Sequence, residues 1–98
     1  MKNWYDHSTE ALCDAFASLR SREECLAFLE DICTIKEILD MSQRLEVARL
    51  LRAGTSYTAI TKATGASTAT ISRVSKCCEY GTGGYRTVID RLNGEENP

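Results

Sequence analysis

Apolar residues recur at intervals of three and four through the first half of the chain, which is the spacing of amphipathic α-helices. No segment alternates between apolar and polar residues for long enough to indicate a strand. Glycine and proline are absent from the first 53 residues, so this region is predicted to be almost entirely helical. The apolar positions that carry the pattern are Trp4, Leu12, Phe16, Leu19, Leu26, Phe28, Leu29, Ile32, Ile35, Ile38, Leu39, Leu45 and Leu51. The pattern predicts an all-α fold.

Two capping boxes divide the N-terminal region. Ser21 precedes Glu24 by three residues, and Thr34 precedes Glu37 by three, which is the spacing at which the two residues of a box cap a helix start. Helices are therefore expected to start near residues 21 and 34. The second of these should run over 35–53, because Gly54 is placed to end it in the left-handed conformation.

Serines and glycines mark the remaining helices. Ser56 can cap a helix that runs through Thr64 and ends at Gly65, and Ser67 can cap another that runs towards Cys78. The sequence "YGTGGY" then interrupts the helical pattern. A last helix through "YRTVIDRL" should stop near residue 93, and "GEENP" is predicted to be a frayed tail.

Residues 56–76, "SYTAITKATGASTATISRVSK", have the pattern of a helix-turn-helix. The first helix is expected to face inward with Ala59 and Ile60, and the second with Ile71 and Val74. The turn lies at residues 65–67, where glycine adopts a tight conformation without strain.

The second of these helices is rich in hydroxyl groups. Ser and Thr do not stabilise the exposed interior of a helix, because their hydroxyls compete for backbone hydrogen bonds. Their presence on this face is therefore attributed to contacts with a partner. In a helix-turn-helix the second helix lies in the major groove of DNA, where short hydroxyls and methyls contact base edges and phosphates. The candidates are Thr68, Thr70 and Ser72, with Ala69 leaving room for a close approach and Arg73 and Lys76 supplying positive charge. Lys62, Arg49 and Arg52 can add phosphate attraction nearby.

Charge is segregated along the chain, although the net charge is only −2. Residues 1–41 hold four basic and nine acidic side chains, residues 42–78 hold six basic and one acidic, and residues 79–98 hold two basic and four acidic. The basic segment contains the helix-turn-helix pattern, which favours a polyanionic partner such as DNA.

The segments "QRLEVARLL" and "GTSYTAITKATGASTATISRVSKCCEYGTGGYRTVIDRL" resemble the Trp-repressor superfamily, specifically its YerC/YecD branch. The resemblance extends over roughly residues 10–93, and "GASTATISRV" and "YGTGGYR" are its specific parts. It implies a six-helix subunit, an intertwined homodimer built from the helices in residues 3–53, and a bacterial transcriptional regulator, expected to be a repressor, that binds a palindrome.

The resemblance also assigns roles to residues. It places the base-reading region at Ser67, Thr68, Ala69, Thr70 and Ser72, and phosphate contacts at Tyr57, Thr58 and Thr61. The arginine that packs on bound tryptophan in the repressor corresponds to Arg73.

The tryptophan pocket departs from the repressor pattern at two positions. Val74 stands where the repressor has a small glycine, and the second pocket arginine aligns with Gln43 unless the register shifts to Arg44. A ligand pocket would therefore involve Arg44 and Arg73, but L-tryptophan is not expected to act as a corepressor.

Other features indicate assembly rather than catalysis. Trp4, Tyr5, Phe16 and Phe28 are among more apolar side chains than a 98-residue chain can cover alone, which favours a core shared in a homodimer. The single histidine, His7, has no nucleophile at a defined spacing, and "GTGG" lacks the strand and lysine of a phosphate-binding loop. We expect neither an enzyme nor a cofactor.

Five cysteines are present, and none has the spacing of a metal site. Cys13, Cys25 and Cys33 are interpreted as small apolar packing residues, and all five as reduced thiols. With no secretory signal and no membrane-spanning run, the chain is expected to be one soluble cytoplasmic domain over 1–98. The alternative to DNA binding is a helical protein-interaction module that keeps the helix-turn-helix shape without sequence-specific binding.

Overall fold

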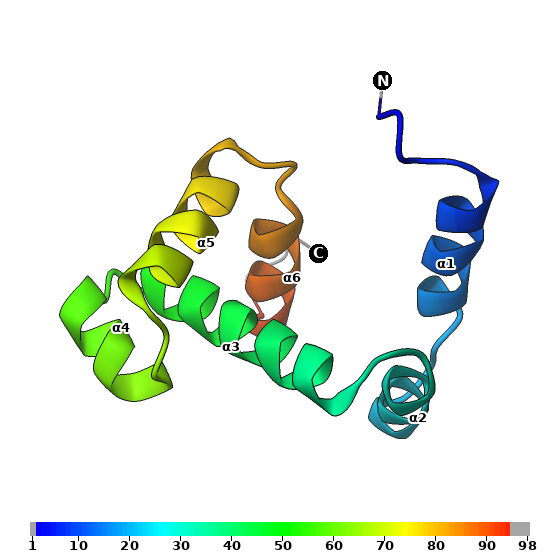
Figure 1. Cartoon of the computed structure of the whole chain (residues 1–98), viewed down its shortest axis with the longest axis horizontal. Helices are drawn as coiled ribbons and strands as arrows, with labels where there is room; N and C mark the ends of the chain where they lie inside the picture. The colour runs from blue at the N-terminus through cyan, green and yellow to red at the C-terminus, as the bar shows by residue number, and fades with distance from the viewer. Residues whose placement is uncertain (1, 95–98) are drawn as a thin grey trace. The chain divides into compact units, whose positions relative to one another are not determined.

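The computed structural model describes residues 2–94, which contain six α-helices and no strand (Figure 1). The helices are α1 His7–Ala17, α2 Arg22–Ile32, α3 Ile35–Arg52, α4 Tyr57–Thr64, α5 Thr68–Tyr80 and α6 Gly84–Leu92. The predicted all-α class and the predicted starts of α2 to α5 are confirmed. Residues 95–98 of the expected tail lie outside the described residues.

The chain divides into two compact units, Met1–Ile38 and Leu39–Pro98. The first contains α1, α2 and the first residues of α3, and the second contains the rest of α3 and the helices α4 to α6. None of the described helices is both long enough and apolar enough to cross a bilayer.

Side-chain caps begin the helices of the first unit. Asp6 starts α1 by accepting hydrogen bonds from the amides of Ser8 (2.9 Å) and Thr9 (3.1 Å). The Ser21 hydroxyl caps α2 by accepting from the Glu24 amide at 3.1 Å, but the Glu24 carboxylate accepts from the Arg20 amide, one residue before the predicted partner.

The predicted box at the start of α3 is complete. The Thr34 hydroxyl accepts from the Glu37 amide at 3.1 Å, and the Glu37 carboxylate accepts from the Thr34 amide at 2.8 Å. At its other end α3 stops before Gly54, which has a φ of 83° as predicted. A polar capping box thus fixes the start of α3, and a left-handed glycine follows its end.

The first unit has no buried side chain within α1 or α2. Phe16 and Phe28 meet edge to face, with ring centroids 5.1 Å apart, and this contact joins the two helices. The prediction that Cys13, Cys25 and Cys33 pack inward is wrong for the isolated chain, because Cys13 and Cys25 are exposed and Cys33 is half-buried. These helices are too short to enclose a core between them.

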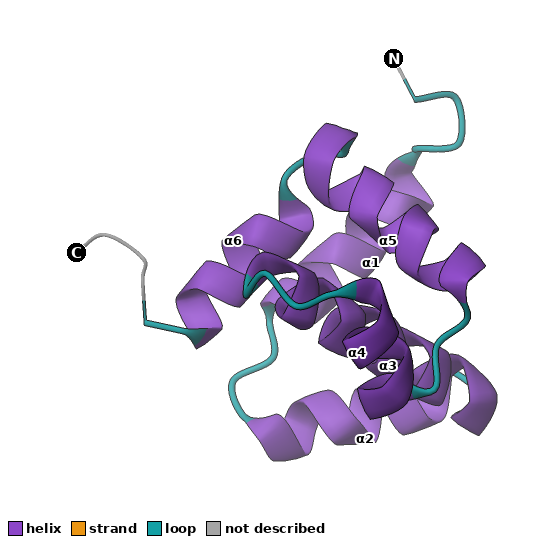
Figure 2. Ribbon diagram, turned by 90° about the vertical axis from the view of Figure 1, so that its left-hand side faces the viewer, coloured by secondary structure: helices purple, strands orange, loops and turns teal. Residues whose placement is uncertain are grey.

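Among the residues that the structure describes, the core lies entirely in the second unit. Helices α4, α5 and α6 gather against α3, with α4 packed on α5 and α5 on α6 (Figure 2). The fully buried side chains are Val47, Ala48, Ile60, Ala66, Ile71, Val74 and Ile89. Each of α3, α4, α5 and α6 contributes at least one of them, so the core positions α4 and α5 on the other two helices.

Removing one core side chain should destabilise the protein strongly. Ile71 is fully buried, so Ile71→Ala is expected to lower the free energy of unfolding by about 2–5 kcal/mol through lost burial and a residual cavity. Denaturant unfolding at matched protein concentration measures this change. The control Lys62→Ala, at an exposed position, should change it by about 0.5 kcal/mol or less. Equal effects of the two substitutions would contradict the position of the core.

Candidate nucleic-acid interface

The structure forms the helix-turn-helix where the sequence predicts it. Ser56 caps α4 by accepting from the Ala59 amide at 3.2 Å. Gly65 ends α4 with a φ of 76°, and its amide donates to the Thr61 carbonyl at 2.8 Å. Ser67 then caps α5 by accepting from the Thr70 amide at 3.1 Å. A left-handed glycine and a serine cap therefore turn the chain within three residues.

Apolar contacts hold α4 and α5 against α3. Ile60 from α4, Ala66 from the turn and Ile71 from α5 are all buried in the core. Ala59 was predicted to face inward with Ile60, and this is wrong: Ala59 is exposed. Neighbouring residues on a helix point about 100° apart, and in α4 Ile60 faces the core while Ala59 lies outside it.

The outer face of α5 carries most of the predicted base-reading residues. Thr68, Ala69, Arg73 and Lys76 are exposed, and Ser72 is half-buried. The capping residue Ser67 is exposed as well, and its hydroxyl donates to the Thr70 hydroxyl at 3.1 Å. The hydroxyls of Ser67 and Thr70 are thus partly committed to the cap, whereas Thr68, Ala69, Arg73 and Lys76 are exposed.

The predicted phosphate-contacting residues lie on the exposed side of α4. Tyr57, Thr58 and Thr61 are all exposed, and Tyr57 and Thr58 occupy its first turn. The structure therefore brings these residues and the outer face of α5 onto two adjoining helices (Figure 1).

The basic residues around this surface fall into two groups. Arg49 is paired with Glu46 at 2.8 Å, and Arg52 forms two hydrogen bonds to Asp90 at 2.7 and 2.8 Å. Within residues 2–94, no ion-pair partner is recorded for Lys62, Arg73 or Lys76. The three unpaired cations lie on α4 and α5, so their charge is the part available to an anionic partner.

A cavity of about 220 Å³ lies between α3 and α5. Arg44 and Arg73, the two arginines predicted for a ligand pocket, both line it, and so does Val74. The full lining is Asp40, Gln43, Arg44, Thr70, Arg73 and Val74. The structure thus brings the predicted pocket residues together, and it adds a carboxylate, Asp40, that sequence reasoning did not include.

Gln43 makes a contact that sequence reasoning also missed. Its side-chain amide donates to the backbone carbonyl of Thr64 at 3.2 Å, across 21 positions of sequence. Nothing in the local pattern indicates this bond, because it joins the middle of α3 to the last residue of α4.

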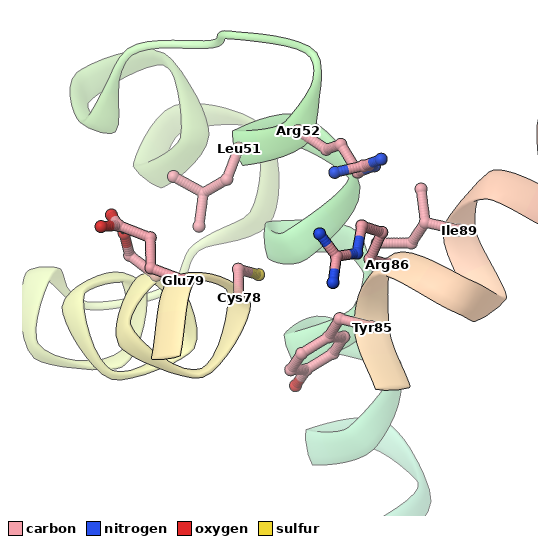
Figure 3. Close-up of a pocket in the computed structure, with 8 residues that line it drawn as sticks. Leu51, Arg52, Cys78, Glu79, Tyr85, Arg86 and Ile89 are labelled. Carbon is pink, nitrogen blue, oxygen red and sulfur yellow. The ribbon is translucent and has the colours of Figure 1, made fainter. Parts of the chain in front are cut away.

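A second cavity, of about 370 Å³, lies among α3, the end of α5 and α6 (Figure 3). Burial raises the pKa of the Cys78 thiol, and Cys77 raises it further against the opposing charge of Arg52. Burial also raises the pKa of the Tyr85 hydroxyl, against the opposing effect of Arg44. Both groups therefore stay protonated at neutral pH. From α5 this cavity is lined by Ser75, Cys78 and Glu79. The predicted base-reading residues lie at the other end of that helix.

Known proteins are similar to this chain over both of its units. The description of the matching family is Trp repressor protein, and its model covers residues 7–93. YerC of Bacillus subtilis, an uncharacterized protein, is 49% identical over 87 residues, covering 89% of this chain and 84% of that protein. The crystal structure of a candidate Trp repressor from Staphylococcus aureus is 42% identical with a TM-score of 0.88, covering 96% of this chain and 94% of that one. A TrpR-like protein from Eubacterium eligens is 48% identical with a TM-score of 0.87, covering 94% and 95%.

Proposed function

The chain belongs to the Trp repressor protein family, and from this premise we propose that it is a bacterial transcriptional repressor that binds double-stranded DNA as a homodimer. The helix-turn-helix of residues 56–76 is the DNA-binding element, and the helices in residues 3–53 make the dimer. Such a protein acts in the cytoplasm, where bacterial DNA is accessible.

The observation that carries the proposal is the outward face of α5. Thr68, Ala69 and Ser72 offer two hydroxyls and a small side chain near the start of the helix, and Arg73 and Lys76 follow with unpaired charge. An α-helix fits the major groove, where its first residues reach base edges and hydroxyls contact bases and phosphates. The surface therefore combines groups that distinguish bases with groups that attract any duplex.

The residues of α4 complete the interface. In a helix-turn-helix the first helix crosses the DNA backbone, and Tyr57, Thr58 and Thr61 present three hydroxyls on its exposed side. Hydroxyl contacts to phosphates orient a protein on the duplex without reading its sequence. We assign these three residues to that positioning role.

Selection from random duplex DNA, followed by affinity measurements at several salt concentrations, tests the proposal. A palindromic site should emerge, because a symmetric dimer presents two copies of α5 to two half-sites. Affinity should fall steeply with salt, since cations on each subunit release counterions from the DNA. A protein-interaction module would instead enrich no sequence and would show no steep salt dependence.

Two substitutions should separate base reading from phosphate attraction. Thr68→Leu is expected to weaken binding to the selected site by about 1–3 kcal/mol, with little change on random DNA, because it removes a base contact. Lys76→Ala should weaken binding to both DNAs alike and reduce the salt slope by about 1. Fluorescence anisotropy with selected and random duplexes measures both effects. If the two variants changed both affinities in the same way, the assigned roles would be wrong.

A further inference from the structure

The hydrogen bond from Gln43 to Thr64 joins α3 to the point where α4 ends and the turn begins. Gln43 is half-buried, and its side-chain nitrogen lies 3.2 Å from the Thr64 carbonyl oxygen. Carbonyls in the last turn of a helix lack partners within the helix, so an outside donor satisfies an acceptor that would otherwise need water. The bond is thus a directed link between the supporting helix and the turn.

Thr64 is itself fixed to its neighbours through its side chain. Its hydroxyl donates to the Ile60 carbonyl at 2.8 Å and accepts from the Ala66 amide at 3.1 Å. The backbone carbonyl held by Gln43 and the hydroxyl that holds Ala66 therefore belong to one residue. A displacement of Thr64 would be passed to both sides of the turn.

The apolar core alone specifies the angle of α5 less sharply than the hydrogen bond from Gln43 to Thr64 does. Burial of Ile60, Ala66 and Ile71 is favourable over a range of small rotations, because the hydrophobic effect has no direction. A hydrogen bond weakens steeply when its angle changes. Only three residues lie between Thr64 and Thr68, the first residue of α5, so a small movement of the turn moves the start of that helix.

We propose that Gln43 is a positioning residue for DNA recognition: its bond to Thr64 sets the turn and thereby the angle at which α5 enters the groove. This inference rests on the proposed DNA-binding function and adds to it a residue outside the helix-turn-helix. Because the bond is made by the chain's own side chain, the reading geometry is present in the purified protein without an added ligand.

The test compares a variant that lacks the donor with one that retains it. Gln43→Met keeps a similar length but leaves Thr64 without its donor, and Gln43→Lys supplies another N–H donor near the end of α4. Gln43→Met is expected to lower the ratio of specific to random-DNA affinity about three- to tenfold, the size of one net hydrogen bond. Gln43→Lys should keep the ratio within about twofold of the wild type. Glu46→Gln, which removes the ion pair to Arg49 on the same helix, is the matched control and should also keep it.

A second measurement reports on the turn without DNA. Amide hydrogen exchange at Gly65 and Ala66 should accelerate in Gln43→Met, while thermal unfolding shows that the rest of the fold is retained. An unchanged affinity ratio in Gln43→Met, or an equal loss in Gln43→Lys, would overturn the inference. If the wild-type protein prefers no DNA sequence, the proposed function fails, and unchanged exchange at these two amides would then show that Gln43 does not hold the turn either.

Discussion

Sedimentation of the chain at micromolar concentration is expected to show a dimer of about 22 kDa, twice the 10.9 kDa subunit, with no folded monomer. Among residues 2–94, all fully buried side chains lie in the second unit, while the N-terminal half of the chain leaves large apolar residues exposed. Trp4 is 64% exposed, Ile35 is 65% exposed and Leu39 is 62% exposed. A second copy that covers such side chains contributes about 1.5–3 kcal/mol for each one fully buried.

A charge placed at one of these exposed apolar positions should disrupt the assembly. Leu26 is 52% exposed on α2, and Leu26→Glu is expected to shift sedimentation towards the monomer and to lower the thermal midpoint, because the dimer would have to bury a carboxylate. Glu30→Gln, a polar change on the same helix, is the control and should sediment as the wild type does. A compact wild-type monomer with a thermal midpoint independent of concentration would refute the prediction of an obligate dimer.

Local signals were sufficient to predict most of the fold. Ser56 and Ser67 cap helices, and Gly54 and Gly65 adopt left-handed conformations, at the predicted positions. Each of these signals acts within a few residues, so it does not depend on how the rest of the chain packs. The start of α1 was missed because its capping box pairs Asp6 with Thr9 rather than with a Glu or Gln.

Burial was harder to predict than helix position. Ala59 was assigned inward and is exposed, and Cys13 and Cys25 are exposed in the isolated chain. Helical periodicity identifies an apolar face but does not say what covers it. In the single chain no side chain of α1 or α2 is buried. Periodicity alone could therefore not distinguish a core from a surface shared with a second copy.

Some residues of the candidate interface could be predicted from the sequence, and others could not. The residues on α5 could be named from the sequence because they lie together on one short helix. Gln43 and Asp40 could not, since they reach the helix-turn-helix through the fold rather than through sequence spacing. Resemblance to a family aligned Gln43 with a pocket arginine, but only the structure shows its amide bonded to Thr64.

The structure strengthens the expectation that L-tryptophan is not a corepressor. The cavity that Arg44 and Arg73 share has a volume of about 220 Å³, below the range of about 300–1,000 Å³ common for ligand pockets. Val74 is only 2% exposed and lines this cavity, so its branched side chain occupies space that a flat ring would need.

Calorimetry of the purified protein with L-tryptophan is therefore expected to show no binding at physiological concentrations. Overpacking a close-fitting site costs about 1–3 kcal/mol, so affinity should fall about five- to 150-fold relative to a pocket with a smaller residue in place of Val74. DNA binding should accordingly be the same with and without L-tryptophan. A titration with the selected duplex measures this, and it also shows that the protein is active. A dissociation constant in the tens of micromolar or tighter would refute this prediction.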